Sequence, residues 1–279
     1  MIITEKSEVL PFVQSGIEKS DLNSLYIPSE FSDIIPQLTK IGETIYYSKP
    51  SSVQYMTNEL IGSYLAKRLG LDTVDYQIGL RKEDSQFFAL SELFYEDGYQ
   101  YQSALEFLGE HHYRNCFSMA QSGIKTVVPC YYSLRTLRPY KGTPFYDKNL
   151  KLIALDLKMA QRDRHEKNII IKMASKGTID LAPIYDYGRS YSPFYDNDAY
   201  GNPFAFIRFN TATLELLFRR YPNLRDYVEF LTKISIDEIL TAIEQEKRVC
   251  FTEEIRQDYR KAQELSENVI NKIKIKTYY

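Results

Sequence analysis

The feature that most constrains this chain is a pair of polar segments on either side of a predicted hairpin. Asp163 and Asn168 form the first segment, and Asp186-Tyr-Gly forms the second. Between them, short apolar stretches at 168–173 and 178–184 flank a Ser-Lys-Gly turn, a pattern typical of two strands joined by a tight turn. The far strand would deliver Asp186 beside Asn168, so three oxygen-bearing side chains are expected in one place.

This arrangement suits phosphoryl transfer. The Asp163 carboxylate can orient an attacking hydroxyl group and accept its proton. Asn168 and Asp186 can hold Mg²⁺, which takes few protein oxygens and keeps phosphate and water in its shell. The order Arg-Asp-x4-Asn and then Asp-Tyr-Gly resembles the protein-kinase signature, with Tyr in place of Phe. The alternative is that these are ordinary solvated turn residues.

The first hundred residues predict a small β region around one helix. Strands are expected at 44–49, 74–80 and 86–94 from their β-branched and aromatic residues. Apolar residues at three-to-four spacing predict an amphipathic helix over 53–69. Ser51 and Gln54 form a candidate capping box for this helix, and Gly70 is expected to end it.

Lys49 closes the first of these strands, and Glu59 lies on the helix that follows. A strand lysine paired with a helix carboxylate is the arrangement that holds nucleotide phosphates in kinases. We therefore expect Lys49 to contact the phosphates and Glu59 to pair with it. Taken singly, each residue is more often a surface charge.

The remainder of the chain predicts mostly helices, at 102–122, 147–160, 211–221, 236–248 and from Thr252 onward. Ser235 and Glu238 form a capping box for the fourth of them. Residues 186–210 are predicted to form a long loop. The fold expected is α+β and two-lobed, similar to protein kinases, with a small antiparallel β lobe at 1–98 and a mainly helical lobe at 99–279.

Composition sets limits on partners and compartment. The net charge of -2 carries no excess that calls for nucleic acid or a membrane surface, and no apolar run is long enough for a transmembrane helix. The three cysteines include no CxxC pair, so we expect buried reduced thiols rather than a zinc site or disulfides. The N-terminal residues do not resemble a signal peptide. We expect a cytoplasmic protein, with secretion as an effector left open.

Two kinase families resemble the loop around Asp163. Phosphatidylinositol kinases carry Asp-Arg-His-x-x-Asn, which the chain matches from Asp163 to Asn168. HipA-like bacterial kinases carry Asp-x-His-x-Lys-Asn and a later Pro-x-Tyr-Asp, and this chain has Lys167 before Asn168 and Pro-Ile-Tyr before Asp186. Lys49-Pro, the later Asn-Glu pair that ends in Glu59, and Ser-Glu-Leu-Phe at 91–94 also resemble HipA-like segments. The resemblance covers residues 45 to 190 and favours the HipA-like family.

The resemblance implies roles for individual residues. Asp163 would be the catalytic base, and Asn168 and Asp186 would hold Mg²⁺. The residues implied to contact ATP are Lys49, Glu59, Glu92, Leu93, Phe94, His165, Lys167, Tyr185 and Asp186. Family members are serine/threonine protein kinases, and several are toxins of toxin–antitoxin modules.

The substrate implied is a Ser or Thr hydroxyl group of a protein, and an antitoxin or effector target is a candidate partner. Two other functions stay open: a lipid or small-molecule kinase, and a binding module that has lost transfer. No Lys/Arg cluster follows Asp186, which argues against anionic lipid headgroups. No glycine-rich loop precedes Lys49, which keeps the binding module open.

Overall fold

The structure is a computed structural model of the chain. It describes residues 2–4, 8–10, 37–41, 44–81, 86–108, 138–161, 164, 168–175, 177–191 and 211–276. Within these ranges, no helix combines the length and the apolar character that crossing a bilayer requires.

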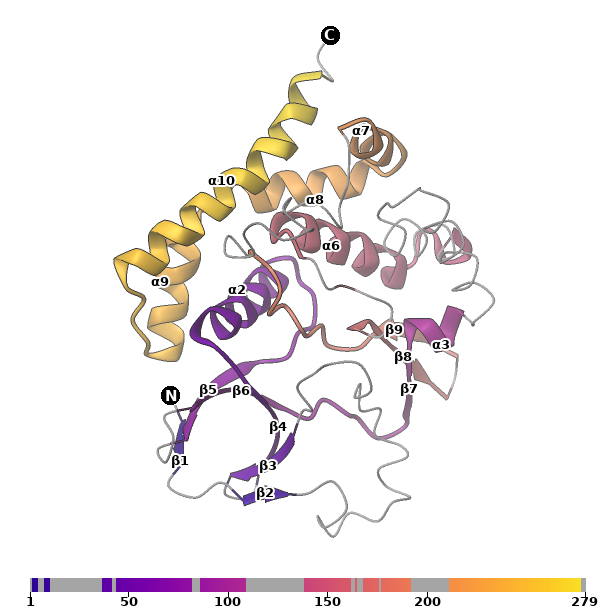
Figure 1. Cartoon of the computed structure of the whole chain (residues 1–279). Helices are drawn as coiled ribbons and strands as arrows, with labels where there is room; N and C mark the ends of the chain where they lie inside the picture. The colour runs from indigo at the N-terminus through magenta and orange to yellow at the C-terminus, as the bar shows by residue number, and fades with distance from the viewer. Residues whose placement is uncertain are drawn as a thin grey trace, which may run out of the picture.

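An N-terminal six-stranded sheet has the order β1-β5-β6-β4-β3-β2 (Figure 1). The strands are β1 (Ile2–Thr4), β2 (Glu8–Leu10), β3 (Gln37–Ile41), β4 (Thr44–Pro50), β5 (Tyr76–Arg81) and β6 (Gln86–Glu92). Neighbouring strands pair antiparallel, except that β1 pairs parallel with β5. The expected antiparallel β region is confirmed, and it has more strands than the three that the sequence predicted.

Helix α2 (Val53–Arg68) follows β4 directly and packs against β5, β6 and helices of the C-terminal part. Its N-cap is Ser52, whose Oγ accepts a hydrogen bond from the backbone of Tyr55, so the predicted Ser51–Gln54 capping box is wrong. Ser51 lies one residue before the cap, and its hydroxyl donates to the Lys49 carbonyl at 3.0 Å. The helix ends as predicted, with Gly70 at φ +68°.

A second sheet of three strands, in the order β7-β8-β9, lies beside α2 and the first sheet, at the right of the view in Figure 1. Its strands are β7 (Tyr99–Ser103), β8 (Ile170–Ala174) and β9 (Ile179–Leu181). The β8–β9 pair is the predicted hairpin. Residues 99–103 form β7, although a helix was predicted from residue 102. The helix begins at residue 104, and what was predicted for 109–122 lies outside the described residues.

The C-terminal part is helical, as predicted. It contains α3 (Ala104–Leu108), the 3₁₀ turn η1 (Arg138–Tyr140), α6 (Pro144–Lys158), α7 (Thr211–Arg220), α8 (Pro222–Thr232), α9 (Ile236–Lys247) and α10 (Glu253–Lys276). Ser235 caps α9 through the backbone of Glu238, as the sequence indicated. Helix α8 was not predicted. Pro222 begins it, since proline fits the first helical turn but cannot continue the preceding helix.

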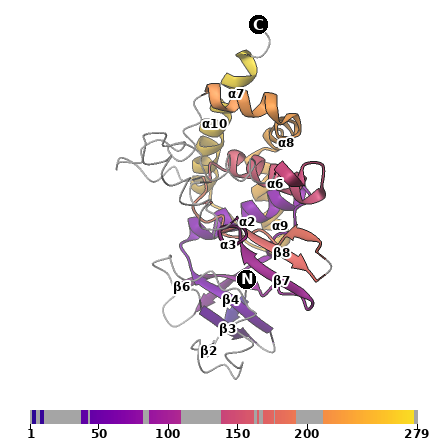
Figure 2. The same ribbon diagram turned by 90° about the vertical axis from the view of Figure 1, so that its right-hand side faces the viewer.

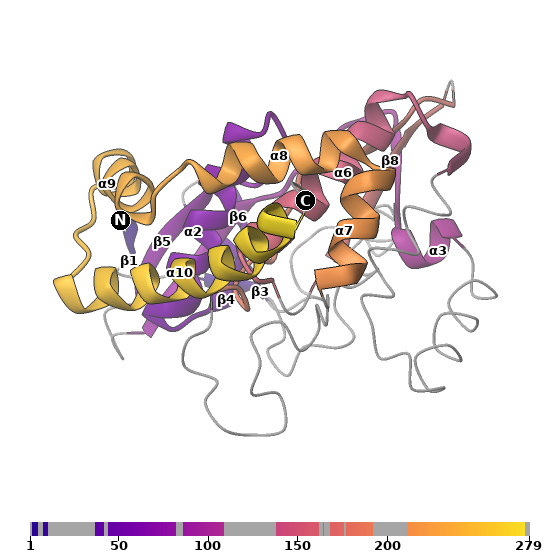
Figure 3. The same cartoon turned by 90° about the horizontal axis from the view of Figure 1, so that it is seen from above.

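One hydrophobic core runs from β5 and β6 through α2 and α6 to α8, α9 and α10. Figure 2 shows strands β2, β3 and β4 at one end of the molecule and α7 and α8 at the other. Seen from above, α10 runs next to α2, between α9 and the C-terminus (Figure 3). Helix α2 is therefore the element that joins the β region to the helices. Cys250 is exposed, contrary to the expectation of buried thiols, and Cys116 and Cys130 lie outside the described residues.

Candidate active site

The structure brings the end of β4 and the start of α2 to the segment after β9. The Lys49 ammonium group lies 3.3 Å from Asp186 Oδ1. The Tyr55 hydroxyl donates to the same carboxylate oxygen at 2.9 Å and also contacts the Lys49 ammonium group. Lys49 therefore points into the molecule toward Asp186.

The β8–β9 hairpin places Asn168 beside Asp186, as its two ends were predicted to do. Asn168 Nδ2 donates to Asp186 Oδ2 at 2.8 Å, and both side chains are largely buried. Together they supply a carboxylate and an amide oxygen, which are the ligand types that Mg²⁺ prefers. Among the described residues no cluster of three His, Cys, Asp or Glu side chains could hold a metal. Mg²⁺ takes few protein oxygens and keeps phosphate and water in its shell, so a carboxylate and an amide oxygen are donors that suit it.

The backbone at Asp186 adopts a left-handed conformation, with φ +60°. Asp tolerates this region better than most residues, but the conformation still needs support from its surroundings. The Gln161 side chain donates to the Asp186 carbonyl at 2.8 Å, and the Asp186 N–H donates to the Tyr76 hydroxyl at 3.1 Å. Both backbone polar groups of Asp186 are therefore held by side chains.

Glu59 does not pair with Lys49, so that part of the expectation is wrong. Its buried carboxylate accepts the backbone N–H groups of Tyr187 at 2.8 Å and of Gly188 at 3.1 Å. Burial and the nearby charge of Asp186 raise the pKa of Glu59 to about 7. Glu59 thus holds the backbone of the Asp-Tyr-Gly segment.

Charge at Asp186 is set by its partners. Burial alone would raise its pKa, but the charge of Lys49 and the hydrogen bond from Tyr55 outweigh burial, and the pKa of Asp186 is lowered. The carboxylate is therefore ionised over the physiological range, which is the form that can bind a cation.

Two glycines allow the segment to pack closely on α2. A Cβ atom at Gly188 would lie 1.9 Å from the Tyr55 ring, and one at Gly62 would lie 2.1 Å from the Tyr187 ring. The Tyr187 side chain is fully buried against α2. Glycine at these positions is needed for close approach.

Arg164 supports the other side of the site and was not singled out from the sequence. Its Nε lies 3.2 Å from both carboxylate oxygens of Asp156 on α6, and this ion pair is buried. Its Nη1 donates to the carbonyls of Asn168 at 3.3 Å and Tyr185 at 2.7 Å. One side chain thus fixes the backbone at Asn168 and immediately before Asp186.

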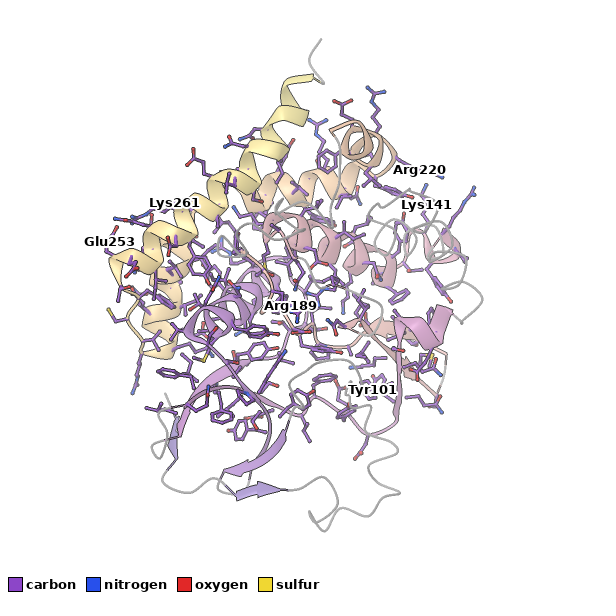
Figure 4. The ribbon with its side chains drawn as sticks, viewed as in Figure 1. Tyr101, Lys141, Arg189, Arg220, Glu253 and Lys261 are labelled. Carbon is purple, nitrogen blue, oxygen red and sulfur yellow. The ribbon has the colours of Figure 1, made fainter. Side chains whose placement is uncertain are left out.

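Three residues implied to contact ATP through their backbone groups at adenine lie at the end of β6 and directly after it. Glu92 is its last residue and pairs with Tyr46 of β4, and Leu93 and Phe94 lead away from it. The Phe94 ring stacks on the Tyr185 ring with centroids 6.1 Å apart. Glu92, Leu93 and Phe94 thus lead from the N-terminal sheet toward the residue before Asp186. Tyr101, labelled in Figure 4, packs edge-on to Phe94.

Asp163, His165 and Lys167 lie outside the described residues, and their predicted roles stay predictions. Of the residues that sequence reasoning missed, Tyr55 lies on the predicted helix near Glu59, where the sequence had pointed only to the Asn58–Glu59 pair. Arg164 lies within the motif itself, next to Asp163. Their positions next to motif residues could have pointed to a role in the site. The sequence could not show which groups they contact.

No family model matches the chain, and no curated protein matches it. Among solved structures, it resembles HipA of the Shewanella oneidensis toxin–antitoxin system HipA, HipB and operator DNA complex, with a TM-score of 0.58 and 14% identity. That match covers 86% of this chain and 64% of that chain, so this chain spans less than two thirds of it.

Two further matches have lower scores. The Helicobacter pylori proinflammatory kinase CtkA matches with a TM-score of 0.48 and 13% identity, covering 86% of this chain and 89% of that one. The choline kinase LicA from Streptococcus pneumoniae matches with a TM-score of 0.26 and 14% identity, covering 84% and 89%. The HipA match shows that the chain has a kinase-like fold, as the sequence predicted.

Proposed function

We propose that this chain, whose fold is that of HipA, is an ATP- and Mg²⁺-dependent kinase that phosphorylates Ser or Thr hydroxyl groups of a protein. The observation that carries the proposal is the meeting of Lys49, Asn168 and Asp186. A cation, an amide and an ionised carboxylate come together from three separate parts of the chain. Cations for phosphates and oxygen ligands for Mg²⁺ are the parts that phosphoryl transfer requires.

Each residue has a distinct task in this reaction. Lys49 would bind the α- and β-phosphates, with His165 and Lys167 against the phosphates. Asn168 and Asp186 would hold Mg²⁺, which when bound neutralises charge on the phosphates. Asp163 would orient the protein hydroxyl group and accept its proton as the oxygen attacks the γ-phosphorus and ADP leaves. Backbone groups from Glu92 to Phe94 would bind adenine, with Tyr185 beside Phe94.

One experiment tests this proposal against both alternative functions, a lipid or small-molecule kinase and a binding module without transfer. Purified protein is incubated with labelled ATP and a cell lysate, with and without Mg²⁺, and its intact mass is measured for autophosphorylation. We expect label on protein that depends on Mg²⁺ and is lost in Asp186→Asn. Asp97→Asn, a change of an exposed carboxylate, is the matched control and should keep activity.

The other outcomes are distinct. Label in the lipid or small-molecule fraction alone would contradict the protein substrate. Mg²⁺-dependent nucleotide binding without any transfer would favour the binding module. No nucleotide binding at all would overturn the proposal.

A further inference from the structure

Helix α10 places the hydroxyl group of Tyr259 near a side chain that holds the backbone after Asp186. The Tyr259 hydroxyl has two acceptors on α2: Asn58 Oδ1 at 2.7 Å, the shorter contact, and the Gln54 carbonyl at 3.2 Å. Asn58 Nδ2 in turn donates to the carbonyls of Gly188 at 2.7 Å and Ser190 at 2.5 Å. Figure 4 labels two residues near this connection in the chain: Arg189, which stands between Gly188 and Ser190, and Lys261, two residues after Tyr259 on α10.

The direction of these hydrogen bonds is determined by chemistry. Two carbonyl oxygens can only accept, so the amide nitrogen of Asn58 faces them and its oxygen faces Tyr259. The Tyr259 side chain is buried, and burial raises its pKa, so the hydroxyl keeps the proton that it donates. Its ring packs edge-on to Tyr191, with centroids 6.0 Å apart. The position of the hydroxyl is therefore held by packing at both ends.

The Asn58 contacts complete the support of Gly188. Glu59 accepts the Gly188 N–H, and Asn58 donates to the Gly188 carbonyl, so neighbouring side chains of α2 hold both polar groups of one residue. Gly188 comes two residues after Asp186, whose left-handed backbone needs support. A shift of this peptide would move the Asp186 carboxylate away from Asn168 and Lys49.

We propose that Tyr259 is a positioning residue for phosphoryl transfer, because its hydroxyl orients Asn58 and Asn58 holds the backbone after Asp186 in the metal-binding arrangement. Helix α10 then helps to set the geometry of the site, although in this proposal it contacts neither ATP nor the acceptor. This proposal rests on the proposed kinase function.

The test is Tyr259→Phe, which removes the hydroxyl and keeps the ring. The matched control is Tyr227→Phe, which removes a hydroxyl that donates to Asp147 Oδ1 at 2.5 Å between α8 and α6, away from the site. Nucleotide binding is titrated with Mg²⁺ at fixed ATP. Loss of one buried hydrogen bond should raise the Mg²⁺ concentration needed for half-maximal binding about fivefold to tenfold in Tyr259→Phe. Tyr227→Phe should not change it.

A second measurement does not depend on activity. Hydrogen exchange of the backbone amides at Tyr187 and Gly188 should be faster in Tyr259→Phe than in wild type or Tyr227→Phe. Asn58→Asp retains an acceptor for Tyr259 but places an oxygen against the two carbonyls, so it should have the same two effects. Adding Tyr259→Phe to Asn58→Asp should then bring little further loss, because both act through one contact.

The outcomes separate this inference from the kinase proposal. Unchanged exchange in Tyr259→Phe overturns the positioning role, and so does faster exchange with an unchanged Mg²⁺ requirement. Faster exchange in a chain whose wild type binds no nucleotide supports the contact but overturns the kinase proposal. Faster exchange together with a raised Mg²⁺ requirement supports both.

Discussion

The Lys49 ammonium group and the Asp186 carboxylate lie 3.3 Å apart, although 137 residues separate them in the chain. Tyr55 contacts both, so the pair is tied to the first turns of α2 as well as to β4. Lys49 lies next to the last residue of β4, and Asp186 lies five residues after the end of β9. The ion pair therefore depends on how the N-terminal sheet and the second sheet are placed relative to each other.

Replacing Lys49 by Ala should weaken nucleotide binding strongly and leave the fold intact. The ammonium group is the described cation nearest Asp186, and phosphate oxygens would lose it as a partner. Loss of a hydrogen bond to a charged group is worth about 1.5–3 kcal/mol, which is about a tenfold to hundredfold change in ATP affinity. Calorimetric titration with ATP and Mg²⁺ measures this. Lys141→Ala, at an exposed lysine labelled in Figure 4, is the control, and equal affinities for both variants would contradict the role of Lys49.

The variants Asp163→Asn and Asp186→Asn should lose activity for different reasons. The first should keep ATP affinity within a few fold and reduce kcat by about 10²–10⁴, because a group that accepts the proton acts mainly in the transition state. The second should lose Mg²⁺-dependent binding as well, since it removes the charged metal ligand. Single-turnover rates and nucleotide titrations of both variants give the comparison. If both lost binding equally, Asp163 would belong to the metal site instead.

Glu59 should make the folded protein less stable as the pH rises. Its ordinary pKa is 4.5, and in the folded chain it is raised to about 7. Between these values the native state keeps a proton that the unfolded chain releases, so this stabilisation is complete below pH 4.5 and is lost as the pH approaches 7. The shift corresponds to about 3 kcal/mol in the free energy of unfolding.

Urea unfolding of wild type and Glu59→Gln between pH 4.5 and 7 measures this effect. Glutamine cannot titrate, so the variant should show a flatter pH dependence in this range. Glu254→Gln, on the exposed surface of α10, should keep the wild-type slope. A slope in Glu59→Gln equal to that of wild type would mean that another group is responsible.

Gly188→Ala should destabilise the protein through a steric clash with Tyr55. The added Cβ would lie 1.9 Å from the ring, so the ring or the backbone must move. Overpacking of this kind costs about 1–3 kcal/mol of unfolding free energy. In a Tyr55→Ala background the same substitution should cost much less. Equal costs in both backgrounds, measured by urea unfolding, would place the effect elsewhere.

Local patterns predicted much of this fold because they act over short distances. The strand that ends at Pro50, helix α2 and the β8–β9 hairpin follow from residue type and spacing. Helix α9 and its Ser235 cap follow from the capping box. Prediction failed where the geometry differed from the pattern: α2 begins at Val53, so Ser52 caps it, and residues 99–103 pair with β8 instead of joining a helix.

For the candidate site, the amino-acid sequence predicts which chemical groups the chain carries and in what order. It placed Lys49 at a strand end, and Asn168 and Asp186 on either side of a hairpin, because these features depend on neighbouring residues alone. Their hydrogen-bond and ion-pair partners follow from the packing of the folded chain. Glu59 reaches the Tyr187 and Gly188 amides and leaves Lys49 to Tyr55 and Asp186. The physical reason is that such partners are set by how separate elements pack, and a buried polar group bonds to whichever donor that packing brings within reach.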